Sequence, residues 1–89
     1  MYENALGSLI ELYLKNNQFV LAKGLIYNVS FTLEKNFYYY YLCGLYNQAT
    51  KKNNDAIQFY KTSLNLNPNF EIANTKLLKL IPDTINEEI

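Results

Sequence analysis

The sequence predicts an all-α fold of five antiparallel helices in a single domain. One observation is that apolar residues recur every three or four positions over residues 3–15, which is the period of one helix face. Another is a series of polar or proline-containing breaks that divide the chain into segments of helical length. The aromatic residues 37–46 could instead form a buried strand, but no second segment could pair with it. We therefore interpret residues 37–46 as a helix, with a strand as the alternative.

Composition limits the classes of partner. The 89 residues suffice for one small domain. Eight basic residues balance eight acidic ones, so the basic patch typical of nucleic-acid-binding proteins is not expected. No apolar run is long enough to span a membrane, and the N-terminus lacks the pattern of a signal peptide. We expect no nucleic-acid partner, no membrane association and a cytoplasmic location.

The residues that usually carry catalysis or bind metals are scarce. The chain has no histidine and a single cysteine, Cys43, which excludes an intramolecular disulfide. Its carboxylates are scattered singly, and its three glycines are isolated, so neither a nucleophile–base pair nor a phosphate-binding loop can be assembled from spacing. We interpret Cys43 as a small core residue. The prediction is a protein that is not an enzyme and holds no metal or cofactor.

The first two helices are predicted as an antiparallel hairpin. The first covers Glu3 to Lys15, and the polar pair Asn16-Asn17 ends it. The second runs from Gln18 to about Phe31. The expected buried stripes are Leu6, Leu9, Ile10 and Tyr13 on the first helix, and Phe19, Ala22, Ile26 and Val29 on the second.

The third and fourth helices follow a short polar joint, Thr32 to Asn36. Residues 37–46 are apolar on every side of a helix, so neighbouring elements must cover that helix on more than one side. Lys51 to Asn54 is the predicted turn, in which Asn53 or Asn54 would cap the next helix. That helix runs from Asp55 to Leu66, and Asn67-Pro68 ends it because the residue before a proline disfavours the α conformation.

A fifth helix is expected from about Asn69 to Leu80, with Pro82 as its stop. The tail, Asp83 to Ile89, would be frayed or form one loose turn. This helix is more apolar than one buried stripe requires, and exposed apolar surface of this kind is typical of an interface. The residues that would form this self-association interface are Leu77, Leu78 and Ile81.

The segment Phe37 to Phe70 resembles a tetratricopeptide repeat, a two-helix unit that recurs at a fixed repeat length. The matching positions are Tyr40 for the family's large aromatic, Cys43-Gly44 for its Leu-Gly pair, Ala56, Tyr60, Ser63 in place of an alanine, and Pro68. Asn47 departs from the pattern, which usually has tyrosine there. In this arrangement small residues let the helices approach closely while large ones fill the gaps between them.

A shift back by one repeat length places Ala22 at the position of Ala56 and Ile26 at that of Tyr60, but Ile10 at that of Gly44. The earlier repeat is therefore degenerate. The resemblance implies a right-handed solenoid with repeat 1 at about 3–36, repeat 2 at about 37–70, a terminal capping helix at about 70–81 and a tail at 82–89.

The resemblance also implies a function as a non-catalytic protein-interaction module or scaffold. In this family the first helix of each repeat lines a concave groove that binds a peptide or a partner helix. Here that groove would be lined by Glu11, Leu14, Tyr38, Tyr41, Leu45, Gln48, Thr75 and Lys79. Tyrosines suit such a role, and Tyr38 and Tyr41 are the expected recognition residues. By contrast Tyr39, Tyr40 and Tyr46 are expected in the core. The alternative is a homodimer formed through the apolar C-terminal helix.

Overall fold

A computed structural model shows five α-helices. The structure describes residues 2–32 and 37–88, with the side chains of residues 7–28 and 37–81. The helices are α1 (Tyr2–Lys15), α2 (Phe19–Thr32), α3 (Phe37–Ala49), α4 (Asn53–Leu66) and α5 (Glu71–Glu88). The described residues contain no strand, so the predicted all-α class is confirmed and the strand alternative for residues 37–46 is wrong. In this described part, no helix has both the length and the apolar character needed to cross a membrane.

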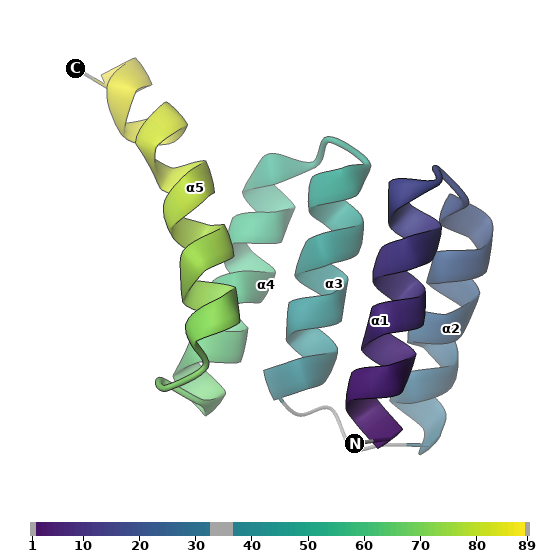
Figure 1. The fold of residues 1–89 in the computed structure, drawn as a ribbon. Coiled ribbons are helices and arrows are strands. Elements are labelled where there is room, and N and C mark those ends of the chain that lie inside the picture. Colours follow the sequence, from purple (N-terminus) through teal and green to yellow (C-terminus); the bar gives the residue numbers. More distant parts are fainter. Residues whose placement is uncertain (1, 33–36, 89) are drawn as a thin grey trace.

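The helices form two layers, and helices that follow one another in the chain run antiparallel (Figure 1). The layer nearer the viewer contains α1, α3 and α5, and α2 and α4 lie behind it. Helix α3 is central, because it contacts α1, α2 and α4. Helix α3 therefore packs against three of the other four helices.

Two turns of the same kind join α1 to α2 and α3 to α4. At the first, Asn17 adopts a left-handed backbone with φ of 59°, and the Gln18 N–H donates to the Tyr13 carbonyl at 2.8 Å. At the second, Lys51 has φ of 69° and the Lys52 N–H donates to the Asn47 carbonyl, also at 2.8 Å. This pattern is a Schellman ending, which satisfies carbonyls in the last turn of a helix. The same ending therefore occurs after α1, at Asn17, and after α3, at Lys51.

The ends of α4 and α5 differ from the prediction. Lys52 occupies the N-cap position of α4 without a capping side chain, so the assignment of Asn53 or Asn54 to that position was wrong. Helix α5 does not stop at Pro82 but continues to Glu88. A proline inside a helix removes one hydrogen bond and crowds the carbonyl four residues earlier, here that of Leu78. Such a defect can bend a helix without ending it, because later residues can resume the hydrogen-bonding pattern.

The middle of α3 is enclosed on every side. Its buried residues are Tyr41, Leu42, Cys43, Gly44 and Leu45. Five consecutive residues exceed one helical turn of 3.6 residues, so every face of α3 is covered at this level. The expectation that residues 37–46 need cover on more than one side is confirmed.

Helices α3 and α4 are joined by a close contact and two hydrogen bonds. A Cβ atom added to Gly44 would lie within 3.0 Å of ring atoms of Tyr60, whose side chain is fully buried. The Tyr60 hydroxyl donates to Gln48 Oε1 at 2.7 Å, and the Ser63 hydroxyl donates to the Phe37 carbonyl at 2.7 Å. The ring of Tyr60 therefore fills the space that a side chain at position 44 would need.

We predict that Gly44→Ala destabilises the domain although alanine favours helix. The added methyl group must displace a fully buried ring, and overpacking costs about 1–3 kcal/mol, partly offset by about 1 kcal/mol of helix propensity. Gly24→Ala is the matched control, since no described residue lies within 4 Å of its added Cβ, and it should stabilise by up to about 1 kcal/mol. Urea unfolding of both variants measures the difference. Equal shifts of the two in the same direction would contradict the packing described.

Candidate functional site

Four of the eight residues predicted to line a concave groove surround one depression between α1, α3 and α5. This α1–α3–α5 depression has a volume of about 260 Å³. Its lining residues are Glu11, Leu14, Lys15, Leu45, Gln48, Ala49 and Lys76. The predicted residues among them are Glu11, Leu14, Leu45 and Gln48. Leu14 and Leu45 are largely buried, and Glu11, Lys15, Gln48 and Lys76 bring charged or polar groups to the lining.

Tyr41 is a core residue, and the prediction that it forms a recognition face is wrong. Its side chain is only 2% exposed, with its ring centroid 5.2 Å from that of Phe70 and 6.2 Å from that of Tyr60. Burial raises the pKa of Tyr41 well above its usual range, and the Glu11 carboxylate adds to this shift through its charge and a hydrogen bond. The segment before α5 brings Phe70 over the start of α3, which closes this side of the helix.

The remaining predicted groove residues lie outside the depression. Tyr38 is half-buried, and its ring centroid lies 6.2 Å from that of Phe70. Its side chain fills the space beside Gly7. Thr75 and Lys79 are exposed on α5 and do not line the depression. The predicted line of recognition residues is therefore divided between the core, one small depression and the outer surface of α5.

The tyrosines predicted as core are only half-buried. Tyr40 stacks on Phe59 of α4 with ring centroids 6.4 Å apart. Tyr39 and Tyr46 pack against the core on one side and line a second, larger hollow on the other. The division of the tyrosines thus differs from the prediction, because Tyr41 is inside whereas Tyr38, Tyr39, Tyr40 and Tyr46 are all half-buried.

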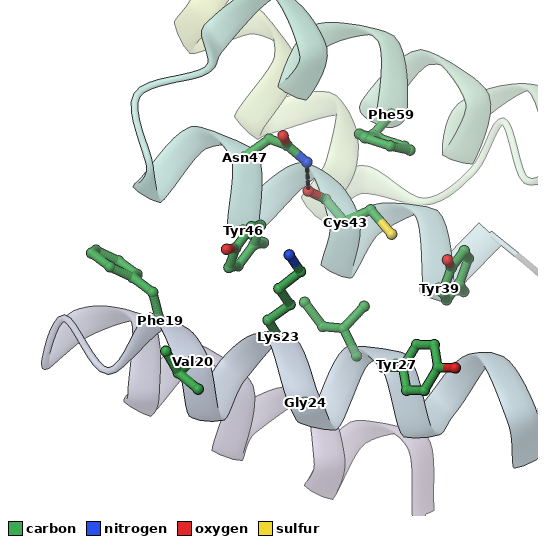
Figure 2. A pocket seen from close by; sticks show the side chains of 11 residues that line it. Phe19, Val20, Lys23, Gly24, Tyr27, Tyr39, Cys43, Tyr46, Asn47 and Phe59 are labelled. Atoms are coloured by element: carbon green, nitrogen blue, oxygen red, sulfur yellow. Dashed lines mark hydrogen bonds between the residues drawn. The ribbon is translucent and has the colours of Figure 1, made fainter.

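The larger hollow lies between α2 and α4, with α3 as its floor (Figure 2). We call it the α2–α4 groove. It is open and has a volume of about 860 Å³. Its lining residues are Phe19, Val20, Lys23, Gly24, Ile26 and Tyr27 of α2, Tyr39, Cys43, Tyr46 and Asn47 of α3, and Phe59 of α4. Most of these side chains are aromatic or aliphatic.

Helix geometry sets the two hollows on opposite sides of α3. Residues two positions apart on a helix are separated by about 200° around its axis. Cys43 in the α2–α4 groove and Leu45 in the α1–α3–α5 depression therefore face opposite ways. The enclosed helix serves as the floor of one hollow and a wall of the other.

The α2–α4 groove was not predicted from the sequence, although α2 has apolar residues beyond its buried stripe that indicate it. Val20 is 85% exposed, and Leu21 and Tyr27 are also exposed. A helix with apolar residues beyond its buried stripe presents surface that the domain itself does not cover. The prediction noted such an excess only for the last helix.

The polar chemistry of the α2–α4 groove is limited. Among the described residues that line it, Lys23 is the one with a charge, and its side chain extends from α2 towards α3 (Figure 2). Asn47 Nδ2 donates to the Cys43 carbonyl at 2.8 Å. Burial raises the pKa of Tyr39 to about 12, with a smaller effect from the neighbouring Cys43. The groove is therefore an aromatic surface with a single cation in its described lining.

No cluster of three or more histidine, cysteine or acidic residues that could hold a metal ion occurs among the described residues. Cys43 is buried at the floor of the groove.

The chain matches no protein-family model, no curated protein and no solved structure.

The residues considered for self-association fall into two groups. Leu77 is buried in the core, so its assignment to an exposed surface was wrong. Ile81 is half-buried, and Leu78 is 55% exposed. Ile72, which was not among the residues predicted for self-association, is 53% exposed on the same helix. Within residues 71–81, helix α5 therefore presents Ile72 and Leu78 to its surroundings.

We predict that the domain loses stability as the pH rises above about 10. Burial raises the pKa values of Tyr39, Tyr41 and Tyr60 in the folded state, whereas tyrosines in an unfolded chain ionise near pH 10. The unfolded state therefore releases protons first, so stability is complete below about pH 10 and is lost as the pH rises further. Urea unfolding at a series of pH values between 8 and 12 would measure this loss.

Tyr41→Phe tests the contribution of one residue to this pH dependence. At neutral pH the variant should lose about 0.5–1.5 kcal/mol with the hydroxyl hydrogen bond. Its stability should then fall less steeply than that of the parent above pH 10. An equally steep fall would show that Tyr41 is not one of the responsible groups.

Proposed function

We propose that this chain is a non-catalytic protein-interaction module that binds a partner protein in the α2–α4 groove. The observation that carries the proposal is an open, mainly apolar groove of about 860 Å³ on a small domain. Binding sites are typically concave and apolar with a few polar groups, and this description fits the groove.

The aromatic lining favours the α2–α4 groove over the α1–α3–α5 depression as the main site. Tyrosine and tryptophan are enriched among the residues that contribute most to protein interfaces. The groove includes five aromatic residues, namely Phe19, Tyr27, Tyr39, Tyr46 and Phe59. The depression is less than a third as large and includes Glu11, Lys15 and Lys76. It suits an accessory polar contact better than an apolar anchor.

A tetratricopeptide-like solenoid is the architecture that we propose for the module. Three features support it: the sequence pattern of Phe37 to Phe70, the close contact of Gly44 with Tyr60, and the two Schellman turns one repeat length apart. A stack of helix hairpins of this kind typically exposes extended binding surfaces. A non-catalytic role is consistent with the absence of histidine from the sequence and with the burial of Cys43.

A peptide selection tests the function. We would select binders from a displayed library of random peptides long enough for about four helical turns and measure their affinity by fluorescence anisotropy. Val20→Glu should weaken binding about tenfold or more, because it places a charge at the rim of the groove, while stability changes by less than about 0.5 kcal/mol at so exposed a site. Leu66→Glu, at an exposed leucine of α4 outside both hollows, is the control and should leave binding unchanged.

Failure of the selection to enrich any peptide would contradict the function. Peptides that bind Val20→Glu as tightly as the parent would contradict the site. If Glu11→Ala weakened peptide binding and Val20→Glu had no effect, the binding site would lie in the α1–α3–α5 depression.

Self-association through α5 is a second candidate function, favoured by the exposure of Leu78 and Ile72 on one helix. It predicts a dimer by sedimentation at micromolar concentrations. Leu78→Glu should dissociate that dimer without unfolding the domain, whereas Leu66→Glu should not. A monomer at all accessible concentrations would exclude this candidate.

A further inference from the structure

We propose that the occupant of the α2–α4 groove is an amphipathic helix of a partner protein, which places an apolar side chain over Gly24 and a carboxylate beside Lys23. This inference rests on the proposed function and specifies the chemistry of the partner.

Gly24 allows a partner side chain to approach the backbone of α2 closely at the wall of the groove. Of the three glycines, Gly7 and Gly44 are explained by internal packing, because tyrosine side chains occupy the space beside them. Gly24 lies inside α2, and no described residue lies within 4 Å of a Cβ atom added there. Glycine within a helix costs about 1 kcal/mol relative to alanine, so this position loses stability without any gain inside the described part of the domain. The open notch at Gly24 is space that a partner side chain can fill.

The pattern of hydrogen-bonding groups favours a helix over an extended peptide. An extended backbone buried in a groove needs partners for its N–H and C=O groups. Beyond their first turns, the main chains of α2, α3 and α4 use these groups within their own helices, and Asn47 Nδ2 already donates to a backbone carbonyl. The lining therefore has no row of backbone groups with which an extended peptide could pair along its length. A partner helix satisfies its own backbone and needs only an apolar surface. The α2–α4 groove provides such a surface.

The length of the groove suits about two turns of a helix. Its floor runs along α3 from Tyr39 to Asn47, a distance of about 12 Å at 1.5 Å per residue. The α2 wall runs from Phe19 to Tyr27, which is the same number of residues. A partner helix lying along this direction would present apolar residues at i, i+3 or i+4, and i+7.

Charge complementarity defines the polar part of the partner. Lys23 is the one charged residue among the described residues of the lining, which include no carboxylate to pair with it. A partner carboxylate next to the apolar stripe would pair with Lys23 at the rim. Rim charges act mainly on the association rate and its salt dependence, so this contact contributes specificity more than affinity.

The experiment uses peptides selected against the parent domain, with three test variants and one control variant of the domain. Gly24→Leu should weaken binding about tenfold or more, because its side chain fills the notch, while the melting temperature is unchanged or higher. Gly24→Ala should give a smaller loss of the same sign. Lys23→Glu should reduce the association rate severalfold at low salt, and replacing the acidic residue of the peptide by lysine should restore that rate. Lys61→Glu, an exposed site on α4 outside the groove, is the matched charge control.

The secondary structure of the bound peptide gives an independent readout. Circular dichroism should show a gain of helix on binding, and proline in the middle of the peptide should abolish binding. Peptides that need Val20 but bind Gly24→Leu normally, or that remain extended, would overturn this inference and leave the proposed function intact. Peptides that bind Val20→Glu as tightly as the parent would instead overturn the proposed binding site, and with it this inference.

Discussion

The fold depends on the close approach of α3 and α4, which the missing side chain of Gly44 makes possible. The ring of Tyr60 occupies that space and is fully buried, and its hydroxyl reaches Gln48. Ala56 and Ser63 of α4 are also buried, and the Ser63 hydroxyl donates to the Phe37 carbonyl of α3. Cores are packed as densely as organic crystals, and a single methyl group at this position would therefore be felt.

The enclosure of α3 has a functional consequence on each side of the helix. Tyr41 turns inward against Phe70 and Tyr60, where it contributes stability and is inaccessible to a partner. On the opposite side, Tyr39 and Tyr46 are covered only in part and form the floor of the α2–α4 groove. A helix that is apolar all round can thus supply both the centre of the core and the base of a binding surface.

The wall formed by α2 shows how stability and binding compete. Val20 is almost fully exposed, and Gly24 leaves open space where alanine would favour the helix. Neither residue benefits the isolated domain, and natural proteins commonly retain such local costs where a surface has a function. The α3–α4 hairpin, by contrast, uses Gly44, Ala56 and Ser63 for internal packing. The same residue type therefore has different roles in the two hairpins.

The sequence by itself determined the helical class, the five segments and most of their boundaries. Apolar periodicity and asparagine or proline breaks act locally, and these signals do not depend on the arrangement of the helices. Gly44, Ala56 and Tyr60 were also predicted, through the resemblance of Phe37 to Phe70 to a repeat whose pattern sets small residues opposite large ones. Pro82 was misjudged, since a proline weakens a helix at one point but does not prevent its continuation.

Only the tertiary structure decided which side of α3 remains accessible. Tyr38 to Tyr41 have identical side chains, and their exposure depends on where Phe70, α2 and α4 lie around them. That placement follows from contacts between residues far apart in the sequence, which a periodic pattern on one helix does not encode. The sequence therefore specified a helix that had to be buried, and the packing of its neighbours decided that Tyr41 is core while Tyr39 and Tyr46 border the groove.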